Sequence, residues 1–444
     1  MRGISVKGFQ MPILRTDFSD VEDCGMNENF RDKNSHGDTE ARSVAGRQSD
    51  KLPNQTSPEK NILEQEQKMS FGIPRPRASA RKNWKRGKLG EVCSVKTGKL
   101  DANASCEQGK YPFFSCAVSP LRINSYSYDC ECVLVAGNGD LNVKYYKGKF
   151  DAYQRTYIVE SRHHLILSVR YLYYFLDGYL DTLRSFAIGG VIKYIKLGNL
   201  TEADVPLPPL EEQRRIAGTL DKVRELIDVR DRELAKFDEL VKCRFIELFG
   251  DPVTNPKGWE IEKIGKLCEI VSGSTPRTEK EEYWGGKNLW ITPAEISEND
   301  FIISHKERPL SDLGVRSSAL RLLPAGTVLL SSRAPIGKIA ISGIEMYCNQ
   351  GFKNLICGTR IRNIFMWAFL RERKDFLVSL GRGATFKEIS KTIVENISVP
   401  VPPLSLQEEF ARFVAAVDKS KFAVRQSLEK LKICYKSLMQ EYFG

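Results

Sequence analysis

Residues that commonly hold a metal ion or a nucleotide are scarce in this sequence of 444 residues. It has only four histidines, and its eleven cysteines form no Cys-x-x-Cys pair, so the spacing of a zinc site is absent. No Walker A sequence occurs, and no glycine-rich turn joins a strand to a helix as a dinucleotide fold requires. The Asn-Pro-Pro-aromatic string of amino-methyltransferases is also missing. We therefore expect a chain with no catalytic residues, no metal and no cofactor of its own.

Long apolar runs are missing as well. No segment approaches the roughly 20 apolar residues that a membrane span needs, and the first residues lack an apolar stretch with a cleavage site. An odd number of cysteines without a disulfide framework fits free thiols in a reducing compartment. These absences predict a cytoplasmic protein that makes no membrane contact.

Acidic residues are outnumbered. The chain has 67 Lys and Arg against 56 Asp and Glu, a formal net charge of +11. This excess favours an acidic partner, of which nucleic acid is the most frequent. A solvated basic surface without any such partner accounts for the charge equally well, so charge alone leaves both interpretations open.

One long stretch occurs twice. Val205–Gly250 and Val399–Gly444 align without a gap at an offset of 194 residues, and each starts with a proline-rich turn. Apolar residues then recur by threes and fours, which predicts a long helix with one apolar seam. A helix of about 38 residues spans about 57 Å, and two such helices most simply pack on each other, antiparallel. In the first copy the seam, interrupted by Arg230 and Arg244, comprises Ile216, Leu220, Val223, Ile227, Leu234, Phe237, Val241 and Leu248.

A second repeat frames the segment before each helix. Trp84–Gly98 matches Trp259–Gly273, and Gly189–Ile195 matches Gly383–Ile389, whereas the residues between them barely correspond. Two like halves of α+β or α/β type predict a pseudo-two-fold molecule. The predicted order is a disordered tail over 1–82, a compact domain over 84–204, a helical spacer over 205–250, a second domain over 259–398 and a second spacer over 399–444. Predicted strands are Tyr111–Val118, Cys132–Gly137, Tyr157–Glu160, Leu289–Thr292, Thr327–Ser331 and Lys338–Ser342, and predicted domain helices are Leu165–Phe186 and Ile364–Leu380.

Residues that read a nucleic-acid sequence would lie in the unlike middles of the two domains. Arg, Lys, Asn and Gln near turns are the natural candidates, because their side chains donate to base edges. Lys193 and Lys387 follow a glycine turn at the same place in each domain, where backbone can approach a phosphate; an ordinary surface lysine is the equal alternative. The other candidates are Asn138, Asn142, Lys144, Gln154 and Arg155 in the first domain and Arg333, Lys338, Asn349, Gln350 and Lys353 in the second.

The doubled Pro-Pro-Leu-x-x-Gln signature, ending at Gln213 and Gln407, resembles that of the specificity subunit of type I restriction-modification systems, over roughly residues 84–444. The resemblance implies two target recognition domains, each reading one half of a split double-stranded DNA site. Two long antiparallel helices would set the gap between the halves. It also implies two methyltransferase subunits and restriction motor subunits as partners, with S-adenosylmethionine, ATP and Mg in those partners. We assign Gln213 and Gln407 to partner contacts, and we expect a non-catalytic subunit of an adenine methyltransferase and ATP-dependent endonuclease.

Three alternatives remain open at this point. A stand-alone nuclease or methyltransferase fused to two readers would need a catalytic motif that the sequence does not show. A coiled-coil scaffold unrelated to DNA predicts no salt-dependent DNA binding. A specificity subunit of a related system that cuts on both sides of its site would share every feature described above.

Overall fold

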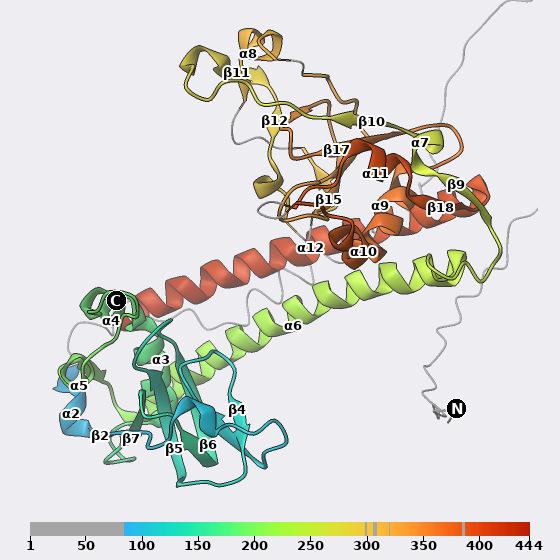
Figure 1. The fold of residues 1–444 in the computed structure, drawn as a ribbon. Coiled ribbons are helices and arrows are strands. Elements are labelled where there is room, and N and C mark those ends of the chain that lie inside the picture. The colour runs from blue at the N-terminus through green and yellow to red at the C-terminus, as the bar shows by residue number, and fades with distance from the viewer. Residues whose placement is uncertain (1–83, 298–299, 305–308, 319, 384–386) are drawn as a thin grey trace, which may run out of the picture. The chain divides into compact units, whose positions relative to one another are not determined.

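The computed structural model describes residues 84–297, 300–304, 309–318, 320–383 and 387–444, and Figure 1 shows their elements. The tail predicted over 1–82 lies outside them. Within the described ranges the chain alternates twice between a domain of mixed sheet and helix and one helix of 40 residues. No helix in these ranges is long and apolar enough to cross a membrane.

A six-stranded sheet forms the body of domain 1. Its strand order is β2-β7-β5-β6-β3-β4, and only the β3–β6 pair is parallel. The bounds are β2 (Cys93–Thr97), β3 (Tyr111–Phe114), β4 (Leu121–Ile123), β5 (Tyr128–Ala136), β6 (Val143–Ala152) and β7 (Thr156–Ser161). Alternation along β5 sends Val133 and Val135 to the core shared with helix α3, and Leu134 to a smaller cluster on the opposite face.

Short elements complete domain 1. Strand β1 (Lys85–Lys88) pairs antiparallel with β8 (Asp204–Leu207), so the two ends of the domain lie side by side. The helices are α2 (Leu89–Val92), η2 (Ala102–Ala104), α3 (Val169–Gly178), α4 (Leu180–Phe186) and α5 (Leu197–Thr201).

Domain 2 repeats this plan around a five-stranded sheet of order β10-β17-β14-β15-β13. Its first and last strands, β9 (Glu260–Lys263) and β18 (Ser398–Val401), pair as β1 and β8 do. The other strands are β10 (Cys268–Ser272), β11 (Trp284–Asn288), β12 (Trp290–Ile291), β13 (Ile302–Ile303), β14 (Val328–Leu330), β15 (Ile339–Ser342), β16 (Tyr347–Cys348) and β17 (Lys353–Cys357). The helices are α7 (Ile264–Leu267), η3 (Glu281–Tyr283), η4 (Pro293–Glu295), α8 (Asp312–Arg316), α9 (Asn363–Glu372), α10 (Lys374–Ser379) and α11 (Lys391–Glu395).

The two long helices are α6 (Leu210–Phe249) and α12 (Leu404–Phe443), and they pack antiparallel as predicted. Residues near the start of α6 share the core of domain 1 with Leu438 and Tyr442 near the end of α12. Residues near the end of α6 share the core of domain 2 with Phe410 and Val414 near the start of α12. The predicted apolar seam therefore packs in two places, because Ile216 and its neighbours are buried in the core of domain 1 and not only against the partner helix.

Several predicted boundaries differ from the structure. Each predicted domain helix is two helices, because the chain leaves the regular helix at Tyr179 and at Arg373. Strand β3 ends at Phe114, short of the predicted Val118. Strand β6, which has ten residues, was not predicted at all.

Candidate nucleic-acid interface

A glycine turn and a hairpin meet at one end of the domain 1 sheet. Strand β5 ends at Ala136, and Asn138 then forms an isolated bridge to Tyr194, which also bridges to Ile188. The Gly139 amide donates to the carbonyl of Lys193 at 2.9 Å. Gly189 has a φ of 122°, and a Cβ there would stand 2.5 Å from the carbonyl oxygen of Ile192. Glycine at this position thus allows the hairpin to close and to bring the Lys193 backbone beside the turn at Asn138.

Domain 2 builds the same arrangement from different side chains. Arg333 follows β14 and bridges to Glu388, which bridges to Arg382 across a hairpin with Gly383 at φ 127°. The Arg333 Nε donates to Glu388 Oε2 at 2.9 Å, and the Lys353 Nζ donates to Glu388 Oε1 at 3.2 Å. Burial raises the pKa of Glu388, but hydrogen bonds from Lys353 and Arg333 outweigh burial, so its pKa lies below the ordinary value.

Some of the remaining domain 1 candidates have exposed side chains, and others are held in hydrogen bonds within the domain. Lys193, Gln154 and Arg155 are exposed, although the Gln154 amide also donates to Asp101 at 2.8 Å. Asn142 donates to the carbonyl of Cys116 at 2.8 Å and accepts a hydrogen bond from Lys144. Burial lowers the pKa of Lys144.

In domain 2 the structure exposes Lys387, Arg333 and Gln350. Thr275 donates to the side-chain oxygen of Gln350. Lys353 is different, because its side chain is only 8 % exposed and its ammonium is paired with Glu388. The two other candidates make hydrogen bonds with backbone groups: Lys338 donates to the carbonyl of Pro293 at 3.0 Å, and Asn349 accepts from the Gly351 amide at 2.9 Å.

The structure therefore brings Asn138 together with Lys193, and Arg333 together with Lys353. Exposed cations and amides at these turns can donate to phosphates and base edges. No cluster of His, Cys, Asp and Glu suited to a metal ion occurs among the described residues.

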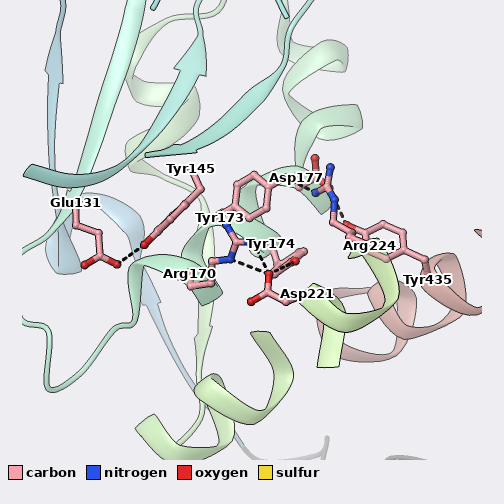
Figure 2. A network of polar contacts seen from close by, with 9 residues as sticks. All are labelled: Glu131, Tyr145, Arg170, Tyr173, Tyr174, Asp177, Asp221, Arg224 and Tyr435. Carbon is pink, nitrogen blue, oxygen red and sulfur yellow. Dashed lines mark hydrogen bonds and ion pairs between the residues drawn. The ribbon is translucent and has the colours of Figure 1, made fainter. Parts of the chain in front are cut away.

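A polar junction connects domain 1 to the long helices (Figure 2), and the sequence did not predict it. Helix α3 carries Arg170, Tyr173, Tyr174 and Asp177 at positions i, i+3, i+4 and i+7, which lie on one face of a helix. Arg170 Nε and the Tyr174 hydroxyl donate to Asp221 Oδ1 of α6 at 2.8 and 2.6 Å. The sequence shows this spacing, but not the partners of these side chains, which lie on α6 and α12.

Two further residues extend this junction to α12. Arg224 of α6 donates to the Tyr173 hydroxyl and lies 3.4 Å from Asp177 Oδ2. The Tyr435 hydroxyl of α12 donates to the same Asp177 oxygen at 3.0 Å. Asp177 of domain 1 therefore contacts both long helices, as Figure 2 shows.

Aromatic rings surround the cation at the domain 1 end of this network. The Arg170 guanidinium lies 4.6 Å from the centre of the Tyr145 ring and 5.2 Å from that of Tyr173. The Tyr145 hydroxyl donates to Glu131 at 2.9 Å. Burial, followed by this hydrogen bond, raises the pKa of Tyr145 to about 12. The ring stays neutral over the physiological range and keeps its donor role.

The junction of domain 2 is mainly aromatic. Phe245 of α6 lies 5.6 Å from both Phe365 of α9 and Phe410 of α12, measured between ring centres. Beside these rings Asp238 of α6 accepts from Arg371 of α9 at 2.9 Å and from Lys421 of α12 at 3.0 Å. Burial raises the pKa of Asp238, but the two cations outweigh it and hold the pKa below its usual value.

The signature glutamines are fully buried. Gln213 accepts from the Ser168 amide at 2.9 Å and donates to the carbonyls of Ile166 and Pro208 at 2.7 and 2.8 Å. Gln407 makes the matching contacts in domain 2. Both side chains tie the start of a long helix to the loop before the domain helix. The partner contact assigned to them stays a prediction, and a direct contact would require this packing to open.

Comparisons with known proteins agree with these features. A family model described as "Type I restriction modification DNA specificity domain" matches residues 81–236 and 256–432. The type I restriction enzyme EcoDI specificity subunit of Escherichia coli is 27% identical over 379 residues, covering 78% of this chain and 83% of the relative. The MjaIX specificity subunit of Methanocaldococcus jannaschii is 33% identical over 184 residues, covering 40% of this chain and 43% of that relative.

A solved structure shares the fold. The S subunit of a type I restriction-modification system from M. genitalium superposes with a TM-score of 0.58 at 18% sequence identity. The superposition covers 83% of this chain and 98% of the other. At this identity the likeness speaks for the fold alone.

Proposed function

The chain belongs to the type I restriction modification DNA specificity domain family, and from that premise we propose that it is the DNA-recognition subunit of a type I restriction-modification complex. One observation carries the proposal. Two copies of the family's domain present the same turn-and-hairpin arrangement, and each packs on a different end of one antiparallel helix pair.

Each domain would bind one half of a split DNA site. Lys193 and Lys387, exposed beside equivalent hairpins, would contact phosphates, which fixes register without reading sequence. The side chains that differ between the domains, such as Asn138 and Arg333 at the matched bridges, would contact base edges. Because these side chains differ, the two half-sites would differ in sequence.

The helix pair would hold the two domains at a fixed separation and bind the catalytic partners. Those partners are two methyltransferase subunits and the restriction subunits, in which S-adenosylmethionine, ATP and Mg would act. This chain would then contribute binding and geometry only. The family membership supports this division of roles.

The test is methylation directed by the assembled complex. The full chain is produced with methyltransferase subunits from its own host, and adenine methylation of a DNA library is sequenced. We expect one bipartite, asymmetric motif. Asn138→Ala in domain 1 should relax only one half of it, and Arg333→Ala only the other half. Methylation that is unchanged when this chain is left out would overturn the proposal.

A further inference from the structure

Helix α3 of domain 1 presents one polar face, made of Arg170, Tyr173, Tyr174 and Asp177. Its four residues meet Asp221 and Arg224 of α6 and Tyr435 of α12, so three elements converge on one network (Figure 2). We propose that this network is a positioning device that fixes domain 1 on the helix pair and so sets the number of base pairs allowed between the two half-sites. The inference rests on the proposed function and assigns part of the spacer selectivity to named side chains.

The first argument is that Asp177 is shared. It lies on α3, inside domain 1, and accepts from Arg224 of α6 and from Tyr435 of α12. Side chains of Asp177 and Arg224 are 24 % and 40 % exposed, so the contact is only partly open to solvent. A domain held through one carboxylate to two antiparallel helices cannot slide along either helix without losing a contact to the other.

The second argument is one of distance. One base pair of B-DNA corresponds to about 3.4 Å along the axis and about 35° of rotation. The contacts from Tyr174 to Asp221 and from Tyr435 to Asp177 measure 2.6 and 3.0 Å, and hydrogen bonds fail beyond about 3.5 Å. A displacement of domain 1 that accommodates one more base pair would therefore break the network.

The third argument is the contrast with domain 2. Phe245, Phe365 and Phe410 form its junction, and contacts between rings depend less on direction than hydrogen bonds do. The internal repeat also reverses the charge: Asp177 of α3 falls on Arg371 of α9, whose acidic partner Asp238 lies on the long helix. The two junctions are therefore not interchangeable: the shared carboxylate lies on the domain helix in domain 1 and on the long helix, as Asp238, in domain 2.

The experiment measures methylation against spacer length. The complete complex with its methyltransferase subunits is given DNA in which both half-sites are kept and the spacer is varied by one and two base pairs. The variants are Asp177→Asn, Tyr435→Phe, which removes only a hydroxyl, and their combination. Arg214→Ala is the matched control, because its ion pair with Glu211 is exposed at both side chains and lies on α6 outside the network.

We expect the wild type and the control to prefer one spacer. In the combined variant, methylation at spacers one base pair away should rise relative to the preferred spacer by about tenfold, the scale of one charge-assisted hydrogen bond. The half-site sequences should stay the same. A uniform fall in rate at every spacer, or unchanged selectivity in all variants, would overturn the inference while leaving the proposed function intact. A wild-type complex that methylates no bipartite site would overturn the proposed function and the inference with it.

Discussion

Replacing Gln213 with alanine tests what the repeated glutamine does. The side chain is fully buried and makes three hydrogen bonds to backbone groups. At about 1 kcal/mol net for each bond, the change should cost about 3 kcal/mol. The cost should be local, since the Ser168 amide loses its acceptor and two carbonyls lose a donor.

Hydrogen exchange followed by mass spectrometry measures this cost directly. A loss of about 3 kcal/mol in the free energy of local opening corresponds to exchange roughly a hundredfold faster, seen in the fragment that contains Ser168. Gln407→Ala is the internal control, because it should accelerate exchange at Arg362 and leave Ser168 unchanged. If Gln213→Ala leaves Ser168 exchange as it is but abolishes binding of the methyltransferase subunits, the structural reasoning is wrong and the partner role is supported.

Three more outcomes follow from the contacts. Asp238→Asn should lower the melting temperature and cost about 3 kcal/mol of folding stability, because it leaves the nearly buried Lys421 without its carboxylate. The double variant with Lys421→Met should recover most of that stability. A double variant no more stable than the single one would contradict this. The pKa of Tyr145 is about 12 in the folded chain and about 10 when unfolded, so its contribution is complete below pH 10 and is lost as pH rises toward 12. Urea midpoints at pH 9 and 11.5 should therefore fall more for the wild type than for Tyr145→Phe, and equal falls would refute the assignment. Lys193→Ala should reduce the magnitude of the slope of log affinity against log salt concentration by about 0.9, without altering the preferred DNA sequence. DNA titrations at several salt concentrations measure this slope. An unchanged slope would exclude a phosphate contact by Lys193.

The sequence predicted two long helices of about 38 residues, and the structure has two of 40, because an apolar seam repeated at an offset of 194 residues is a strong signal. It did not predict β6, whose lysines and tyrosines carry no clear alternation and whose place is set by pairing with β5 along eight residues. The extra break at Tyr179 was also missed. The apolar pattern continues across that break, although α3 ends at Gly178, a residue that favours helix ends.

The candidate site was predictable in part. The sequence predicted a glycine turn before Lys193, and the structure has Gly189 at a φ of 122° there; the phosphate contact of Lys193 stays a prediction. Lys193 lies near Asn138, 55 positions earlier in the chain, because of a backbone bridge between Asn138 and Tyr194. No local sequence pattern predicts that bridge. The spacing of the four polar residues on α3 can be seen in the sequence. Their partners Asp221 and Tyr435 lie on two helices that are distant in the sequence, so only the tertiary structure shows that these residues form a network.

The pairing of β1 with β8, and of β9 with β18, makes each domain a closed insertion in the chain. In each domain the chain enters and leaves through two hydrogen-bonded neighbours, Lys85 opposite Leu207 and Glu260 opposite Val401. A different domain between the same two strands would keep this closure, but it would also have to present residues that pack against α6 and α12. The two-stranded closures and the helix pair together therefore set what any replacement domain would have to match.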